Sequence, residues 1–515
     1  MKKKSSRRQI EVNLDELDRI IDLGTNAPLS KADGQKIKAA LHAMAERLTG
    51  KRSTEKTAAV LPKPTVSGPA KEQATDESAP AGHGRNGAAA FTGADRVSIL
   101  HATLRSGDAC PECGAGKVYR QKEPATLVRI VGQAPLKTTV FEMERLRCNA
   151  CGEIFTAEQP EAAGPDKYDA TAVAMIALLK YGTGLPFKRL EKLESQLAMP
   201  LPAATQWELM EAAAELLRPV LDELIRQAAQ GSVVHNDDTS MRILRLTREP
   251  GDKRSGIFTS GIVSILGAWR IALFFTGPKH AGENIGEVLK QRARDLPAPI
   301  QMCDALSRNT PRQAAVKVLL ANCLAHGRRQ FIEVVESFPE ECAHVLEALG
   351  TVYHNDALAR RQQLSPNDRL RFHQEHSEPV MKELHEWMKA QLAERRTEPN
   401  SGLGKAISYL LNHWTKLTLF LHHPGAPIDN NVVERALKKA ILNRRNALFY
   451  KTLNGARTGD LFMSLIHTCE LNGANPFDYL TELQRHSAAL RAHPAEWMPW
   501  NYRETLTRLT TSAAA

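Results

Sequence analysis

Two pairs of cysteines with zinc-knuckle spacing constrain the fold more strongly than any other feature of this sequence. Cys110 and Cys113 form one Cys-x-x-Cys pair, and Cys148 and Cys151 form the second. Each pair offers two thiolates, and four thiolates complete the closed tetrahedral shell of a structural zinc ion. Strand-like runs lie between the pairs, so we predict a zinc ribbon over residues 100–160. The alternatives are two redox-active pairs or unpaired buried thiols.

The composition excludes several classes of protein. Eight cysteines in 515 residues are too few for a disulfide-stapled scaffold. No uncharged apolar stretch approaches the roughly 18 residues needed to span a membrane, and the N-terminal residues lack the apolar segment of a secretory signal. We therefore expect a soluble, cytoplasmic protein with no membrane partner. At about 150 residues per domain, the length predicts three to four domains.

An excess of positive charge favours polyanions, and nucleic acid first, as partners. The chain has 68 Lys and Arg against 58 Asp and Glu, a net charge of +10. Residues 1–50 are predicted as a helical arm with a basic tail, which either binds DNA ends, dimerises or simply packs on another part. Residues 51–95 are predicted as a flexible linker, because 24 of the 40 positions at 51–90 are Ala, Gly, Pro, Ser or Thr.

Hydrophobic periodicity divides the rest of the chain into helical and mixed segments. Residues 166–230 predict three amphipathic helices, for which a helix-turn-helix module and plain three-helix packing are equal alternatives. Residues 231–345 predict three antiparallel strands, then further strands and helices, which is typical of an α/β sheet with mixed strand directions. Residues 346–425 are predicted as helical, and 486–515 form a C-terminal tail.

Three acids stand where metal-dependent chemistry would place them. Asp237 follows an apolar strand-like run, Asp304 ends another, and Glu434 lies at the start of a helix. Such positions face a common cleft in open α/β sheets. Clustered carboxylates repel one another unless cations lie between them, and their oxygens suit Mg²⁺ or Mn²⁺. Two such ions can drive phosphodiester cleavage.

Each acid also has a structural interpretation. Asp237 and its neighbour Asp238 could form a turn after a strand, and Asp304 could cap a turn. Glu434 follows Asn431 by three residues, as in a helix-capping pair.

A second group of polar residues lies at a predicted strand-to-helix junction. Cys323 and His326 have metal-ligand spacing, but one Cys and one His make an incomplete zinc site. A structural or substrate-positioning role therefore fits them better. Arg328 and Arg329 follow directly and are candidates for DNA contact.

A basic row follows Glu434 with no acid before Asp460. Because a solvated basic face usually has acids interspersed, this row favours contact with DNA phosphates. Its proposed DNA-binding members are Arg435, Lys438, Lys439, Arg444 and Arg445.

Taken in order, these motifs resemble the insertion-sequence-66 family of bacterial DDE transposases over about residues 100–485. The cysteine pairs, Asp237-Asp238-Thr239 and Cys323-Leu-Ala-His326-Gly-Arg-Arg carry part of the resemblance. The most specific segment begins with Asp429-Asn-Asn-Val-Val-Glu434-Arg435 and continues through Asn443-Arg-Arg-Asn446-Ala-Leu-Phe449. The family often has Asp-Glu-Thr at the first motif, which suggests that Asp238 is an auxiliary acid here.

The resemblance implies a multidomain α+β protein with a ribonuclease-H-like α/β catalytic core. Residues 231–345 and 426–485 would form that core, split by the helical insertion at 346–425 and preceded by the zinc ribbon and the helical module. Asp237, Asp304 and Glu434 would bind Mg²⁺ or Mn²⁺ to cut transposon ends and join them to target DNA. We expect a homo-oligomer on DNA in the bacterial nucleoid, with accessory proteins of the same element. The alternative is a catalytically silent DNA-binding descendant.

Overall fold

The chain divides into two compact units. The computed structural model describes residues 88–91, 94–130, 132–149, 151, 153–246, 254, 256–311 and 317–513. One unit ends at Val140, and a larger one contains the described residues from Phe141 onward. The predicted arm and most of the predicted linker lie outside the described residues. The unit boundary falls within the predicted zinc ribbon, between its two cysteine pairs.

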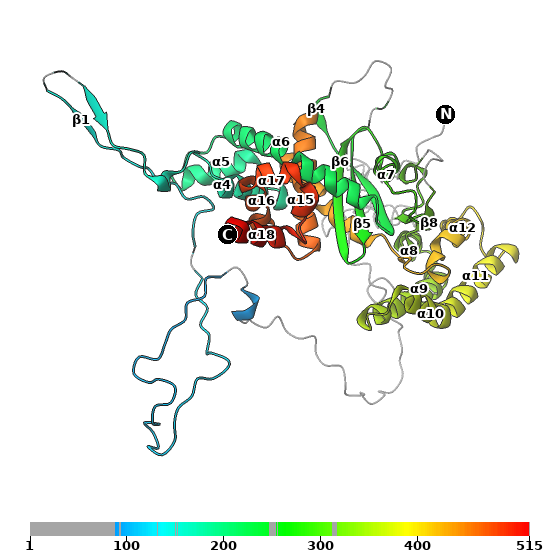
Figure 1. Cartoon of the computed structure of the whole chain (residues 1–515). Helices are drawn as coiled ribbons and strands as arrows, with labels where there is room; N and C mark the ends of the chain where they lie inside the picture. Colours follow the sequence, from blue (N-terminus) through cyan, green and yellow to red (C-terminus); the bar gives the residue numbers. More distant parts are fainter. Residues whose placement is uncertain are drawn as a thin grey trace, which may run out of the picture. The chain divides into compact units, whose positions relative to one another are not determined.

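A five-stranded mixed sheet forms the centre of the larger unit (Figure 1). The strands are β3 (Val233–Ser240), β5 (Phe258–Leu266), β6 (Trp269–Gly277), β7 (Ile300–Cys303) and β8 (Leu319–Asn322). Their order across the sheet is β6-β5-β3-β7-β8. β5 runs antiparallel to β3 and β6, whereas β7 and β8 run parallel to β3. The mixed α/β sheet predicted from the sequence is therefore confirmed.

One predicted strand lies outside this sheet. Residues 241–246 form the short strand β4 (Ile243–Arg245), which pairs in parallel with β9 (Tyr450–Thr452). Met241 and Ile243 are buried with Tyr450 in a small separate core, so this segment packs there instead of adding a strand to the main sheet. As a result, the chain after β3 is held next to a segment two hundred residues later.

Two helices cover opposite faces of β3 and β5. α7 (Ala281–Leu289) contacts both strands on one face, and α14 (Asn431–Ala447) contacts both on the other. Gly261 of β5 allows the close approach of α14, because a Cβ at this position would lie 2.9 Å from Leu437 Cδ2. The antiparallel register pairs Gly261 with Asp237 and Ser260 with Asp238. Directly paired residues share a face, so Asp237 points to the α14 side and Asp238 to the α7 side.

Helices from both ends of the unit gather beside β6 (Figure 1). The three helices predicted over 166–230 are present, and the longest, α6, packs against α15 and against β5 and β6. The bounds are α4 (Ala170–Ala177), the π-helical η3 (Leu178–Gly182), α5 (Phe187–Gln196), α6 (Ala203–Ala228), α15 (Leu453–Leu471), α16 (Pro476–Arg485), α17 (Ser487–Ala492) and α18 (Tyr502–Ala513).

A second helical group follows β8; it covers the insertion predicted at 346–425 but begins earlier, at Leu324. Its apolar core is continuous with the sheet, since Met302 of β7 and Ala321 of β8 belong to the same buried cluster as Leu346 and Leu410. Its bounds are α8 (Leu324–Ile332), α9 (Pro339–Arg361), α10 (Pro366–His376), α11 (Glu378–Ala393), α12 (Gly402–Asn412), α13 (Trp414–Leu417) and η5 (Leu419–Leu421).

Short elements complete the described chain. They are η1 (Ala88–Ala90), η2 (Glu161–Ala163), η4 (Ser307–Asn309), η6 (Pro494–Trp497) and the hairpin of β1 (Arg145–Arg147) and β2 (Ile154–Thr156). Throughout the described residues, every helix is too short or too polar to cross a lipid bilayer.

Polar side chains of α15 satisfy the outer edge of β6. Every second N–H group of β6 points away from β5, and every fourth residue from Asp460 of α15 to Asn472, which directly follows the helix, supplies an acceptor. Four helical residues rise by about 6 Å and two strand residues by about 6.6 Å, so the two repeats stay in step. Four hydrogen bonds result. The N–H groups of Arg270, Ala272, Phe274 and Thr276 donate, in this order, to Asn472 Oδ1 (3.1 Å), Thr468 Oγ1 (3.1 Å), Ser464 Oγ (3.0 Å) and Asp460 Oδ2 (2.6 Å).

We expect Thr468→Val to lower the free energy of unfolding by about 1–3 kcal/mol, because it leaves the buried Ala272 N–H without an acceptor. Thr481→Val is the matched control. Thr481 is also buried on a helix, but its Oγ1 makes no hydrogen bond within the described residues. Removal of this hydroxyl should therefore leave the free energy of unfolding unchanged or raise it. Guanidinium unfolding of both variants measures the difference. Equal stabilities for the two variants would contradict the edge-satisfying role of Thr468.

Candidate active site

Two of the three predicted catalytic acids lie side by side just beyond the point where the parallel pairing of β3 with β7 ends. The register pairs His235 of β3 with Met302 of β7, and two further residues bring Asp237 level with Asp304. Asn309 Nδ2 donates a hydrogen bond to Asp237 Oδ1 (3.2 Å) and another to Asp304 Oδ1. One amide group therefore bridges both carboxylates. The turn interpretation of Asp237 and Asp238 is wrong, because both residues are paired within β3.

The environment of this acid pair disfavours two negative charges. Burial is the main cause that raises the pKa of Asp237 to about 7, and the charges of Asp304 and Asp238 raise it further. A divalent cation would neutralise this repulsion. The donor atoms fit Mg²⁺ or Mn²⁺: both carboxylates offer oxygens, and the buried Oδ1 of Asn309 has no hydrogen-bond partner in the described structure.

Asp238 has a different environment on the opposite face of the sheet. Its Oδ2 lies 2.8 Å from His280 Nδ1 and accepts from Ala281 N at 3.4 Å, at the start of α7. Its Oδ1 lies 3.7 Å from Arg308. These contacts anchor α7 and leave Asp238 facing away from the Asp237–Asp304 pair. Asp304 also bonds Leu306 N at 3.1 Å, so its predicted turn-capping contact is present as well.

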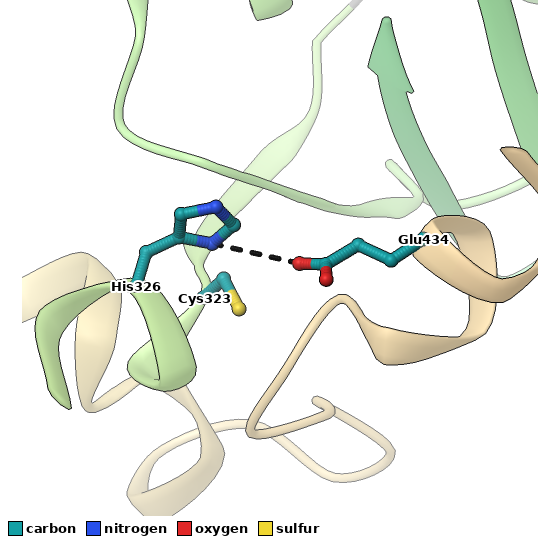
Figure 2. A group of neighbouring side chains, drawn as sticks. All are labelled: Cys323, His326 and Glu434. Carbon is teal, nitrogen blue, oxygen red and sulfur yellow. Dashed lines mark ion pairs between the residues drawn. The ribbon is translucent and has the colours of Figure 1, made fainter. Parts of the chain in front are cut away.

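Glu434 lies in the first turn of α14, but its carboxylate faces a different pair of residues (Figure 2). Its Oε1 is 3.7 Å from His326 Nδ1, and ligand atoms of Cys323, His326 and Glu434 all lie within 4.8 Å of one another. Asp237, Asp304 and Glu434 form no such three-residue group. Asn430 is the residue that caps α14, and it makes no side-chain cap bond, so Glu434 is not part of the predicted capping pair with Asn431.

Asn430 joins the three elements that carry these groups. Its Oδ1 accepts from His235 Nδ1 at 3.1 Å and its Nδ2 donates to Asn236 O at 3.1 Å, both on β3. Its backbone N–H donates to Cys323 Sγ at 3.2 Å. Burial lowers the pKa of His235 to about 4, so at neutral pH this imidazole is uncharged and carries its proton on Nδ1.

The sulfur of Cys323 is fully buried at the start of α8. Burial raises the pKa of its thiol to about 12, although backbone N–H groups of Asn430 and His326 oppose this shift.

The predicted DNA-binding residues fall into two groups. Lys439 and Arg444 are engaged within the fold: Lys439 pairs with Glu470 at 2.7 Å, and Arg444 binds Thr239 Oγ1 at 3.0 Å near the end of β3. Arg435, Lys438 and Arg445 are exposed on α14, and Arg328 and Arg329 are half-buried on α8. Arg435 Nε also donates to Asn431 O at 3.2 Å, but the side chains of Arg435, Lys438 and Arg445 are all exposed to solvent.

The two cysteine pairs each lie in a turn of their own unit. Cys110 N–H donates to Gly116 O (2.8 Å), and Gly114 N–H donates to Cys110 O (2.8 Å). N–H groups of Gly116 and Ala115, with the Cys110 side chain, lower the pKa of Cys113, which favours a metal-binding thiolate. Cys148 N–H donates to Glu153 O (2.9 Å) in the β1–β2 hairpin, which also contains Cys151. The donor chemistry of these turns fits zinc.

Comparison with known proteins identifies the family. A model of the family described as "Transposase IS66 family" matches residues 167–458. The chain belongs to the IS66 transposase family. Three relatives from Sinorhizobium fredii (strain NBRC 101917 / NGR234) are similar to it. The uncharacterized protein y4jD is 27% identical over 76% of this chain and 78% of its own length; y4hP is 25% identical (76% and 73%), and y4qI is 26% identical (64% and 62%).

Sequence reasoning missed Asn309 and Asn430. Both act through amides that form long-range contacts, and although Asn430 lies in the segment that carries the resemblance, spacing alone does not show which partners it bonds. The acceptors of α15 did carry one, because Asp460, Ser464, Thr468 and Asn472 are spaced by four residues. A polar stripe with this period on an otherwise buried helix indicates a backbone edge beside it.

We expect Asn430→Ala to lower the free energy of unfolding by about 2–4 kcal/mol, because it leaves His235 Nδ1 and the Asn236 carbonyl unpaired. Amide hydrogen exchange should also become faster in the first turns of α14. The control is Asn431→Ala, whose side chain bonds only the nearby Asp429, with an expected cost below about 1 kcal/mol. Equal costs for the two variants would show that Asn430 does not hold α14 in place.

Proposed function

We propose that this chain is an active DDE transposase, which cuts DNA at transposon ends and joins the free 3′-hydroxyl to target DNA. The observation that carries the proposal is the proximity of Asp237 and Asp304 on the neighbouring strands β3 and β7, with both carboxylates bridged by Asn309. Family membership supports DNA as the substrate. A buried pair of carboxylates with one amide between them is typical of a site for a divalent cation.

The strand arrangement supports a ribonuclease-H-like core. Three consecutive antiparallel strands come first, and two strands parallel to the first are then added on its other side. The helical insertion follows β8, and α14 returns to the sheet after it. This connectivity fits the split catalytic core expected from the resemblance.

Glu434 is our proposed third acid. α14 packs on the face of the sheet to which Asp237 points, and Asn430 bonds its first turn to β3 next to Asp237. Glu434 therefore lies on the correct face and within one turn of the anchored residue. Its carboxylate faces His326 in the structure, so binding an ion together with the aspartates requires the side chain to turn toward them.

In this mechanism, the protein holds the reacting groups in place. Mg²⁺ or Mn²⁺, when bound by Asp237, Asp304 and Glu434, supplies activation of the attacking oxygen and stabilisation of the leaving one. Asn309 fixes the spacing of the two aspartates. The exposed Arg435, Lys438 and Arg445 grip phosphates beside the scissile bond.

The remaining parts of the proposal concern DNA recognition and assembly. We propose that Cys110, Cys113, Cys148 and Cys151 together bind a structural Zn²⁺ and form the ribbon expected at 100–160. We also propose that several copies act together on paired transposon ends, with accessory proteins of the same element.

We expect Asp237→Asn, Asp304→Asn and Glu434→Gln each to slow Mg²⁺-dependent cleavage and joining of transposon-end DNA by at least about 100-fold, because each removes a metal ligand. Binding of the same DNA should change little. Asp238→Asn is the control: it faces α7, so its loss should act mainly on stability. A wild-type protein that binds transposon ends and never cuts them would instead be a silent DNA-binding descendant.

A pair of adjacent lysines tests the DNA path. Lys438→Ala should weaken DNA binding and reduce the slope of log affinity against log salt by about 0.9, as expected for one lost phosphate contact. Lys439→Ala should leave this slope unchanged, since Lys439 is paired with Glu470. Affinities at several salt concentrations measure both slopes. Identical slopes for Lys438→Ala and wild type would remove α14 from the DNA path.

A further inference from the structure

We propose that Cys323, His326 and Glu434 bind a zinc-type divalent cation, with a fourth coordination position open to solvent. The three side chains come together from two elements, α8 and α14, at the junction drawn in Figure 2. Tetrahedral zinc ligands lie roughly 3.3–3.8 Å apart, given metal–ligand bonds of about 2.0–2.3 Å. His326 Nδ1 and Glu434 Oε1 are 3.7 Å apart, and all three ligand atoms lie within 4.8 Å of one another.

The nitrogen and oxygen donors of this group lack hydrogen-bond partners. His326 Nδ1 and Glu434 Oε1 are both buried atoms without a hydrogen bond in the described structure. Buried polar atoms are nearly always paired, because an unpaired one costs free energy. A cation between the two atoms would satisfy both at once. The side chains themselves are 21% and 29% exposed, so an ion can reach the site.

The sulfur of Cys323 is surrounded as a metal-bound thiolate would be. The backbone N–H group of Asn430 donates to it at 3.2 Å. A neutral thiol is a weak acceptor, whereas a thiolate accepts strong hydrogen bonds. An N–H group aimed at the sulfur therefore supplies an outer-shell contact to a ligand. Binding of the cation replaces the thiol proton, which leaves to solvent.

The donor set separates this site from the aspartate pair. Sulfur, nitrogen and oxygen together suit Zn²⁺ or Co²⁺, whereas Asp237 and Asp304 offer only the oxygens that Mg²⁺ and Mn²⁺ prefer. The bound ion would fasten the first turn of α8 to the first turn of α14, which are joined in sequence only through the long helical insertion. The inference goes beyond the proposed DNA cleavage, with which it shares the side chain of Glu434.

Cobalt(II) titration of the metal-stripped full chain tests the site, because thiolate-bound Co²⁺ absorbs in the near ultraviolet and tetrahedral Co²⁺ in the visible. We expect Cys323→Ala to bind one Co²⁺ fewer per chain than wild type. Glu434→Gln and His326→Ala should weaken this binding by at least about tenfold. The four ribbon cysteines are intact in every variant, so their contribution cancels in the difference spectrum.

Two controls keep the result decisive. Cys342→Ala removes another fully buried thiol of the same apolar core and should leave Co²⁺ binding unchanged. Asp237→Asn should abolish DNA cleavage under the proposed function while keeping the Co²⁺ spectrum, which separates the two claims.

Equal Co²⁺ stoichiometry and affinity in wild type, Cys323→Ala and Glu434→Gln would overturn the site. If Asp237→Asn lost the Co²⁺ absorption assigned to Cys323, this result would also overturn the proposed site, because the ion would then lie at the aspartate pair. Should Cys323→Ala fail to fold, Glu434→Gln decides alone, because its side chain is nearly isosteric and partly exposed.

Discussion

The hydrogen bonds of Asn430 join the three elements that form the candidate site, β3, α8 and α14. One side chain and one backbone N–H connect β3, the start of α8 and the first turn of α14. The helical insertion separates these segments in sequence, so chain connectivity alone cannot align them. A buried amide that must satisfy every donor and acceptor fixes one arrangement of the three elements, because any shift leaves a polar group unpaired. Glu434 takes its position from this arrangement.

Side chains alternate between the two faces of β3, so the neighbouring acids Asp237 and Asp238 have different roles. Asp237 turns toward α14 and shares Asn309 with Asp304, whereas Asp238 turns toward α7 and holds His280. Identical chemistry at adjacent positions thus produces a buried acid pair on one face and a helix anchor on the other. α14 approaches the face to which Asp237 points, which needs Gly261, and burial raises the pKa of Asp237.

The sequence predicted the mixed sheet, its apolar strands and the helical segments before and after it in the chain, because these depend on local periodicity. It ended β3 too early, since the polar run from Asn236 to Ser240 resembles a turn until its pairing with β5 is known. It placed Asp237 and Asp304 together through the rule for strand ends, and the structure brings them together. It could not place Glu434 beside Cys323 and His326. Side-chain direction in the first turn of α14 depends on long-range contacts that leave no trace in spacing.

The contact between α15 and β6 also determines how copies of this protein can meet. An open edge strand invites another strand to pair with it, either from a second molecule or from an unfolded chain. Here a helix occupies that position with four matched acceptors, so the edge is already saturated. A shift of α15 by one residue along β6 would break all four hydrogen bonds at once, so they form or are lost together. Assembly of two copies into one continuous sheet is thereby blocked at β6.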